Sequence, residues 1–261
     1  MLLRTGDFVT FAANGGRAFD PSLPLAVFLH GAGLDHSVWA LHSRWFAHNG
    51  WSVLAPDLPG HGRSGGQPLA SIEEMADWLA QLIEASGAGP AKLIGHSLGS
   101  LVALETAARH PAKVSALGLT GAAATMPVSP ALLGAAEAGD HAAIDMVSIW
   151  GHGFRAALGG SQAPGLWMLG AAGRLLERAR PGVLFADLSA CNNYKGGLEA
   201  AARISVPVTL VLGERDLMTP LKAGRALGAA LPNARMVVLP GAGHMLMAEQ
   251  PDEVLQALSG A

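Results

Sequence analysis

The chain has 261 residues, which is enough for one large α/β domain with a substantial buried core. Half of its residues are hydrophobic, charged residues make up only 14%, and the formal net charge is −3. This balance, without any basic run, argues against a nucleic-acid partner, and the apolar stretches are too short to span a membrane.

The first seven residues lack the long apolar core of a signal peptide. The single cysteine, Cys191, has no intramolecular disulfide partner, which fits a reducing compartment. We therefore expect a cytoplasmic protein. The sequence leaves its oligomeric state open between a monomer and a homodimer.

Short apolar runs alternate with helical patterns through most of the chain. Residues 7–11 are predicted to form a first strand, and residues 25–29 form an apolar run typical of a strand buried on both faces of a parallel sheet. Further strands are predicted at 51–55, 92–94, 114–119, 206–212 and 234–239. Residues 71–74 have the spacing of a capping box that opens a helix, and a last helix is predicted from Pro251 to Leu258. The alternation predicts an α/β fold with a doubly wound, mostly parallel sheet.

Residues 122–198 interrupt this alternation because they contain no clear strand. Helices are predicted there at 130–137, 140–158, 166–179 and 182–191. An insertion of this size is a candidate cap over the carboxyl edge of the sheet, where open α/β sheets place their sites. The predicted organisation is a core of residues 1–121 and 199–261 with a helical cap of residues 122–198.

The segment Gly95-His96-Ser97-Leu98-Gly99 lies between a predicted strand and a predicted helix. This is the context of a nucleophile elbow, in which a strained turn exposes a serine and small neighbours leave room for it. The helix that begins there also directs its N-terminal N–H groups at the site, which favours negative charge. Ser97 is the predicted nucleophile.

A serine hydroxyl needs a base, and the base needs an orienting acid. Asp216 and His244 each follow a predicted parallel strand, so they are expected at the same sheet edge as Ser97. Glu214 and Asp57 are rival acids, although Asp57 is expected to brace the loop of residues 56–64. The order of serine, acid and histidine along the chain is that of the α/β-hydrolases.

The small-residue loop His30-Gly31-Ala32-Gly33 also follows a predicted strand. Such a loop can direct a backbone N–H at a tetrahedral oxyanion. We predict the N–H groups of Ala32 and Leu98 as the two donors, with Gly33 as the alternative to Ala32.

Three other histidines, His30, His61 and His96, are expected to be structural, with His30 ordering the oxyanion loop. No histidine or cysteine spacing indicates a metal site. A dinucleotide-binding Gly-x-Gly-x-x-Gly pattern fails because His36 occupies the third glycine position. Neither a metal nor a cofactor is predicted.

Five motifs in this order resemble those of the α/β-hydrolase superfamily: residues 30–33, 56–64, 95–99, 213–216 and 241–244. The resemblance implies a sheet of about eight strands, lacking part of the first hairpin because the N-terminus is short. It implies a helical cap between strands six and seven, and it places the chain nearest the capped carboxylesterase, lactonase and C–C hydrolase group. Members with a serine nucleophile need no cofactor.

A serine at the elbow forms an acyl-enzyme from a carbonyl substrate, whereas dehalogenase and epoxide hydrolase relatives use an aspartate there. The predicted function is hydrolysis of a small-molecule carboxylic ester or a lactone, with an apolar substrate pocket. One alternative is a C–C bond hydrolase of ring-cleavage diketones that uses the same triad. The alternative of another class is a non-catalytic binding protein with this fold, against which the intact triad argues.

Overall fold

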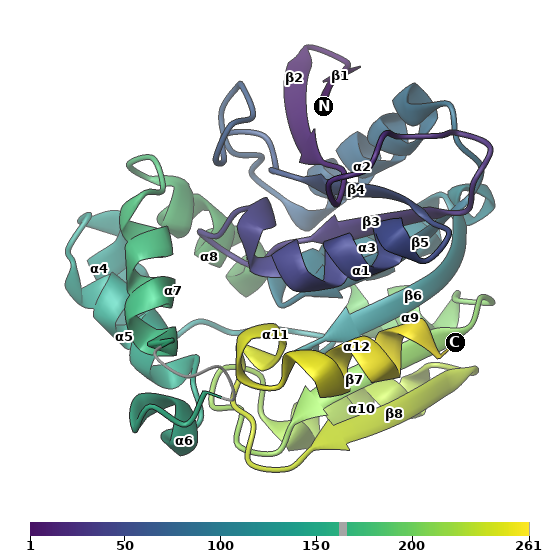
Figure 1. The fold of residues 1–261 in the computed structure, drawn as a ribbon. Coiled ribbons are helices and arrows are strands. Elements are labelled where there is room, and N and C mark those ends of the chain that lie inside the picture. Colours follow the sequence, from purple (N-terminus) through teal and green to yellow (C-terminus); the bar gives the residue numbers. More distant parts are fainter. Residues whose placement is uncertain (162–165, 261) are drawn as a thin grey trace.

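The computed structural model describes residues 1–161 and 166–260, and its centre is an eight-stranded sheet (Figure 1). The strands lie in the order β1-β2-β4-β3-β5-β6-β7-β8, and those from β4 to β8 along this order run parallel. Only the β1–β2 and β2–β4 pairs are antiparallel. The strands are β1 (Leu2–Thr5), β2 (Phe8–Ala13), β3 (Leu25–Leu29), β4 (Ser52–Pro56), β5 (Ala91–His96), β6 (Val114–Thr120), β7 (Val208–Gly213) and β8 (Ala234–Leu239). The doubly wound, mostly parallel sheet predicted from the sequence is confirmed.

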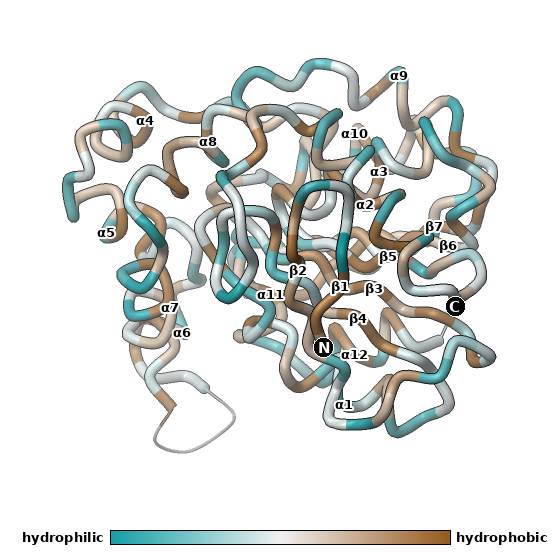
Figure 2. Tube along the Cα trace, turned by 90° about the horizontal axis from the view of Figure 1, so that it is seen from above, coloured by the Kyte–Doolittle hydropathy of each residue, from teal (hydrophilic) through white to brown (hydrophobic). Residues whose placement is uncertain are grey.

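The central strands are buried on both faces, as their apolar runs predict. Along β3, Leu25, Val27 and Leu29 pack into one hydrophobic cluster, whereas Ala26 and Phe28 pack into the other. This alternation follows from the two-residue period of a strand. Figure 2 shows the consequence, because β3 and β5 appear as hydrophobic segments enclosed by the rest of the chain.

Helices cover both faces of the sheet. One face carries α1 (Ala40–His48) and α12 (Pro251–Ser259), and the other carries α2 (Ile72–Ser86), α3 (Leu98–Arg109), α9 (Gly197–Ala202) and α10 (Leu221–Ala230). Helix α2 begins as predicted, since the Ser71 hydroxyl accepts from the Glu74 N–H at 3.2 Å. The Glu74 carboxylate accepts from the N–H of Ala70, one residue earlier than a capping box requires.

The first five helices after β6 in the described part of the chain gather beside the carboxyl edge of the sheet, at the left of Figure 1. They are α4 (Pro130–Glu137), α5 (Ala142–Trp150), α6 (Phe154–Ala157), α7 (Met168–Glu177) and α8 (Val183–Asn193). A small cluster of buried side chains, including Leu132, Ala143 and Leu188, holds α4, α5 and α8 together. We call α4–α8 the cap helices. None of the described helices has both the length and the hydrophobicity that a membrane span needs.

Two sequence-based expectations are wrong in detail, and one helix was not predicted. The first hairpin is complete, because residues 2–5 pair antiparallel with residues 8–11. The single helix predicted at 140–158 is broken at residues 151–153, where the Gly151 carbonyl accepts from the N–H groups of His244 and Met245 instead of continuing the helix. The helix at residues 197–202 was not expected, because its six residues are too few to show a helical period.

Candidate active site

Ser97 lies in a strained turn between β5 and α3. Its φ of 53° and ψ of −119° make it the single non-glycine residue with positive φ among residues 1–161 and 166–260. The glycines of the motif leave room for this turn. A Cβ on Gly95 would overlap the Gly99 carbonyl, and a Cβ on Gly99 would lie 2.5 Å from the Leu29 carbonyl oxygen. Strain of about 1–3 kcal/mol is therefore maintained at the serine, as is typical of a functional site.

The acid and the base predicted from the sequence are in contact. The His244 Nδ1 lies 2.8 Å from Asp216 Oδ2, and both side chains are buried. Asp216 also accepts from the backbone N–H groups of Met218 and Thr219 at 2.8 and 2.7 Å, and from the Thr219 hydroxyl at 2.6 Å. Burial alone would raise the pKa of Asp216, but the charge and hydrogen bond of His244 and the bonds from Thr219 outweigh it and lower that pKa.

An ionised Asp216 fixes the tautomer of His244. Because a carboxylate can only accept, His244 Nδ1 carries the proton and Nε2 keeps its lone pair. His244 and Ser97 line the same cavity, as a base and its nucleophile must.

Several contacts hold the His244 loop in place. His96 Nε2 donates to the His244 carbonyl at 2.9 Å. The Glu249 carboxylate accepts from the N–H groups of Gly153 and Gly243 at 2.9 and 3.1 Å, which ties the break between α5 and α6 to this loop. The predicted base is therefore held by contacts from both the core and the segment between cap helices α5 and α6.

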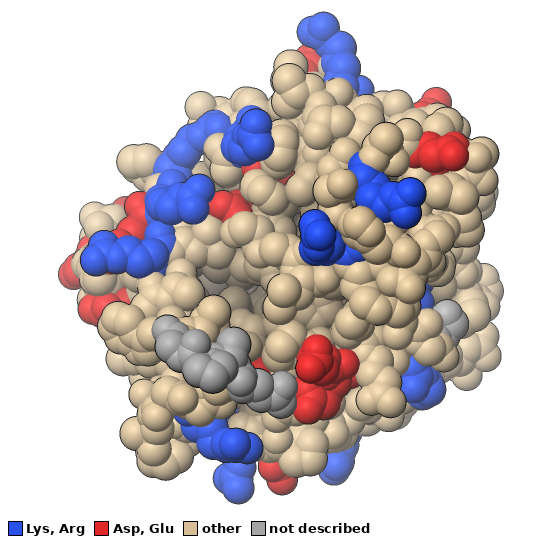
Figure 3. Space-filling view, in the orientation of Figure 1, with Lys and Arg blue, Asp and Glu red and all other residues tan. Residues whose placement is uncertain are grey.

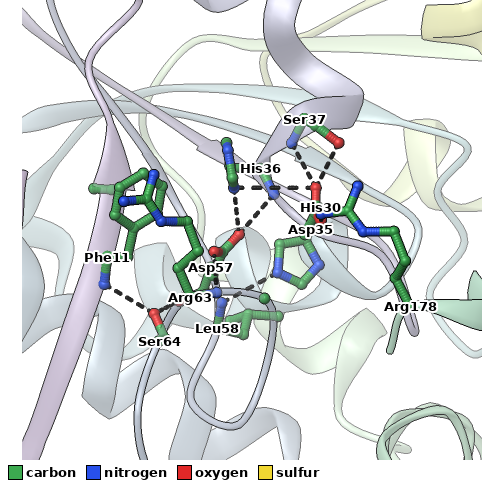
Figure 4. A network of polar contacts seen from close by, with 12 residues as sticks. Phe11, His30, Asp35, His36, Ser37, Asp57, Leu58, Arg63, Ser64 and Arg178 are labelled. Carbon is green, nitrogen blue, oxygen red and sulfur yellow. Dashed lines mark hydrogen bonds and ion pairs between the residues drawn. The ribbon is translucent and has the colours of Figure 1, made fainter. Parts of the chain in front are cut away.

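The rival acids have other roles. Glu214 accepts from the Gly241 N–H at 2.9 Å and braces the turn after β8. Asp57 braces its own loop, as expected, because it accepts from the N–H and Nδ1 of His36 at 2.8 and 2.7 Å and from the Arg63 N–H at 2.8 Å (Figure 4). Within the described residues, Asp35, His36 and Asp57 form the one group of three side chains close enough to hold a metal ion. All three already make hydrogen bonds: His36 with Asp57, and Asp35 with the N–H and hydroxyl of Ser37.

The loop of residues 30–33 lies against the elbow, because a Cβ on Gly31 would lie 3.3 Å from the Ser97 Cβ. His30 orders this loop: its Nδ1 donates to the Gly31 carbonyl at 2.9 Å, and its Nε2 accepts from the Leu58 N–H at 3.1 Å. Burial lowers the pKa of His30 to about 4, so the ring is neutral. The Gly33 N–H donates to Asp187 Oδ2 at 2.8 Å. That bond engages Gly33, the alternative oxyanion donor, and favours Ala32.

Three neighbouring cavities lie between the cap helices and the core, and Ser97 lines two of them. An outer cavity of about 380 Å³ lies between α7 and the core and is lined by Val38, Leu41, Met168, Leu175, Arg174 and Arg178. An inner cavity of about 30 Å³ contains Ser97 and His244, and a side cavity of about 170 Å³ lies beyond Ser97 toward Met126 and Trp150. Figure 3 shows the molecule hollowed between the cap and the core, with basic side chains along the upper left of the hollow. The walls are mainly apolar, as the sequence predicts.

Sequence reasoning missed two buried polar residues at this site. His152 lines both the outer and the inner cavity, and its Nδ1 donates to the Ser148 carbonyl at 2.8 Å. Asp187 lies fully buried on α8 and contacts the oxyanion loop. The signals were weak: a histidine between two glycines inside a predicted helix, and a lone aspartate among apolar cap residues.

Comparison with known proteins agrees with this geometry. The sequence model described as alpha/beta hydrolase fold matches residues 24–251. The pimeloyl-[acyl-carrier protein] methyl ester esterase of Chromobacterium violaceum is 34% identical over 254 residues, covering 90% of this chain and 93% of that protein. The protein of the same name from Aromatoleum aromaticum is 31% identical over 249 residues, covering 88% and 94%.

Solved structures show the same fold. The enol-lactonase from Burkholderia xenovorans superposes with a TM-score of 0.88 at 22% identity, covering 100% of this chain and 98% of that one. A thermophilic esterase superposes with a TM-score of 0.81 at 26% identity, covering 100% and 95%. With a family match over residues 24–251 and relatives above 30% identity along nearly their whole length, the chain belongs to the alpha/beta hydrolase fold family.

Proposed function

We propose that the protein is a serine hydrolase that cleaves a carboxylic ester through an acyl-enzyme on Ser97. The observation that carries this proposal is the buried Asp216–His244 hydrogen bond of 2.8 Å in the cavity that also contains the strained Ser97. A methyl ester esterase with 34% identity over 90% of this chain supports the same reaction.

In the first half of the reaction, His244 Nε2 takes the Ser97 proton while the Ser97 oxygen attacks the ester carbonyl. Asp216 holds the tautomer and stabilises the imidazolium that forms. The N–H groups of Ala32 and Leu98 stabilise the oxyanion, and each such donor is worth roughly 3 kcal/mol in hydrolases of this type. The imidazolium then protonates the leaving alkoxide.

In the second half, a water molecule enters in place of the alcohol. His244 takes a proton from this water, which attacks the acyl carbonyl, and the tetrahedral intermediate collapses to release the carboxylic acid and Ser97. Protonated His244 returns the proton to the serine oxygen. The cycle consumes one ester and one water, and it uses the three side chains of the triad and two backbone N–H groups.

The cavities favour an ester or lactone with an apolar chain. The apolar lining of the outer cavity suits an acyl chain that enters past α7, while the side cavity offers space beyond Ser97 for the other arm. Because relatives of 34% identity are named for a methyl ester on an acyl chain, methyl esters of medium-length dicarboxylic acyl groups are the first substrates to test, followed by lactones.

We propose residues 122–198 as the cap that controls entry to these cavities, with residues 1–121 and 199–261 as the core.

Cytoplasmic location remains a prediction from the single buried cysteine, Cys191. Fractionation of cells that express the tagged protein tests it.

The function is tested by hydrolysis of p-nitrophenyl and methyl esters of graded acyl length, with lactones and a ring-cleavage diketone in the same panel. Ser97→Ala is expected to lower kcat by at least about 10³-fold with an unchanged fold. Ser115→Ala is the matched control, because Ser115 is exposed on β6 and far from the cavities. Ester hydrolysis that survives Ser97→Ala would exclude this mechanism, and a strong preference for the diketone would favour C–C cleavage.

A further inference from the structure

A buried ion pair joins the cap to the core beside the oxyanion loop. Asp187 on α8 is fully buried, and its Oδ2 lies 2.8 Å from Nε2 of His61, which is 2% exposed. The two residues are 126 positions apart in the chain. Nothing in the triad chemistry requires either of them.

The partners of His61 fix its protonation state. Its Nδ1 lies 3.0 Å from the Pro59 carbonyl oxygen and its Nε2 lies 2.8 Å from the Asp187 carboxylate. Both neighbours are acceptors, so both ring nitrogens donate and the ring is an imidazolium. Burial alone would lower the pKa of His61, but the charge and hydrogen bond of Asp187 outweigh it and raise that pKa.

The same carboxylate oxygen reaches the oxyanion loop, because Asp187 Oδ2 also accepts from the Gly33 N–H at 2.8 Å. This bond fixes the peptide plane between Ala32 and Gly33. The plane between Gly31 and Ala32 contains the Ala32 N–H, and it is fixed from the other side by the bond from His30 Nδ1 to the Gly31 carbonyl. Asp187 and His30 therefore hold both planes that flank Ala32.

We propose that Asp187 is a positioning residue, charge-paired with His61, through which cap helix α8 sets the direction of the oxyanion donor Ala32 N–H. The inference rests on the proposed acyl-enzyme mechanism. It adds that the position of α8 relative to the core affects how well the Ala32 N–H stabilises the transition state.

The alternative is that the pair only stabilises the fold. Buried ion pairs contribute little net stability compared with well-packed hydrophobic residues, because both charges must be desolvated. Within the described residues, the second oxygen of Asp187, Oδ1, is buried without a hydrogen-bond partner, which adds to that cost. The geometry imposed on Gly33 is the better explanation for the pair.

The first test compares Asp187→Leu and Asp187→Asn with the wild type, with rates normalised to active sites titrated by a fluorophosphonate. Asp187→Leu is expected to lower kcat about 10- to 100-fold with KM changed less than about twofold, because a displaced donor weakens only the transition state. The inhibition constant of an alkyl trifluoromethyl ketone, which mimics the oxyanion, is expected to rise by the same factor. Asp187→Asn is expected to recover much of the loss, since its amide oxygen can still accept from Gly33.

Arg180→Gln is the matched control. Arg180 also joins the cap region to the core, through the Gly62 and Ser64 carbonyl oxygens, but it does not touch the oxyanion loop. Its kcat and its inhibition constant for the ketone are expected to equal those of the wild type.

The second test is a pH profile of kcat. At alkaline pH, His61 loses the proton on Nδ1 and keeps the Nε2–H that faces Asp187. The ion pair then becomes a hydrogen bond from a neutral ring, its hold on Asp187 weakens, and kcat is expected to fall. In His61→Gln this fall is expected to disappear because an amide does not titrate. The ionisable groups that face His61 are Asp187 on α8, Asp57 after β4 and His30 after β3, and the buried Cys191 on α8 interacts with Asp187. Asp35, His36, Arg63 and Arg178 line the adjoining cavity.

Two results would overturn the inference. One is an Asp187→Leu enzyme that is less stable but has wild-type kcat per titrated site and binds the ketone equally well. The other is an alkaline profile that is the same in His61→Gln and the wild type. Failure of the proposed function is distinguishable, because the wild type itself would then neither hydrolyse esters nor react with the fluorophosphonate.

Discussion

Four histidines around Ser97 differ in which ring nitrogen carries the proton, and this decides their roles. His30 and His244 donate from Nδ1, His96 donates from Nε2, and His61 donates from both. Burial lowers the pKa of His96 to about 3, so it is a neutral brace. His244 combines an ionised carboxylate partner with a lone pair in the cavity that contains Ser97.

Asp216 can be separated from its rival Glu214 by isosteric amides. Asp216→Asn is expected to lower kcat by about 10³- to 10⁴-fold, because the amide no longer selects the Nδ1–H tautomer of His244. Glu214→Gln is the control, because the Glu214 carboxylate binds the exposed turn after β8. This variant is expected to retain activity. Initial rates on one ester measure both. If the two effects were reversed, the acid would be misassigned.

The residues of the proposed triad were predicted to lie at one sheet edge, whereas Asp187 and His152 were not predicted at the site. Ser97, Asp216 and His244 each follow a strand, and parallel strands bring their carboxyl ends to one edge. Asp187 and His152 lie on cap segments whose packing on the core depends on tertiary contacts, such as the bond from Gly33 to Asp187. No periodicity encodes such contacts.

At the scale of elements, the elbow depends on the close approach of β5, α3 and β3. Gly99→Ala would place a Cβ within 2.5 Å of the Leu29 carbonyl and 2.6 Å of the His30 carbonyl. The backbone must then shift, and we expect a loss of about 1–3 kcal/mol in the free energy of unfolding together with most of the activity. Urea unfolding and ester hydrolysis measure the two effects.

Gly89→Ala is the control for this steric argument. A Cβ at Gly89 meets no atom within 4 Å among the described residues, so stability and activity are expected to stay within about 0.5 kcal/mol and twofold of the wild type. Equal effects of the two substitutions would refute the account of the elbow.

Two strands were predicted to the residue: β3, which is buried throughout, and β8, an edge strand with exposed residues. Residues 25–29 and 234–239 agree with β3 and β8 to the residue. The first hairpin was expected to be incomplete because the N-terminus is short. Strand β1 itself was missed because it lies at the sheet edge and pairs with β2 alone, which leaves it with little apolar pattern. The break at 151–153 was invisible because its cause is a contact with the distant His244 loop.

At the scale of the whole molecule, three buried histidines make stability depend on pH. Burial lowers the pKa of His30 and His42 to about 4 and that of His96 to about 3, from an ordinary value of 6.5. The unfolded chain therefore takes up protons near pH 6.5 while the folded chain does not. The stability is fully present above pH 6.5 and is lost as the pH falls toward 4.

From pH 7 to pH 5 we expect the free energy of unfolding to fall by roughly 2 kcal/mol for each of these histidines. The raised pKa of His61 has the opposite sign, because its stabilisation is present below pH 6.5 and is lost as the pH rises through its folded value. Urea unfolding at several pH values measures the slope. His42→Phe is expected to reduce it, and a pH-independent stability would contradict the prediction.

The central claim is that Ser97 is the working nucleophile of an ester hydrolase, and covalent labelling tests it most directly. Intact-mass and peptide mass spectrometry after reaction with a fluorophosphonate are predicted to show one adduct per chain, located on Ser97. In Ser97→Ala both the adduct and ester hydrolysis are predicted to disappear. An adduct on another residue, or ester hydrolysis that persists without Ser97, would contradict the account.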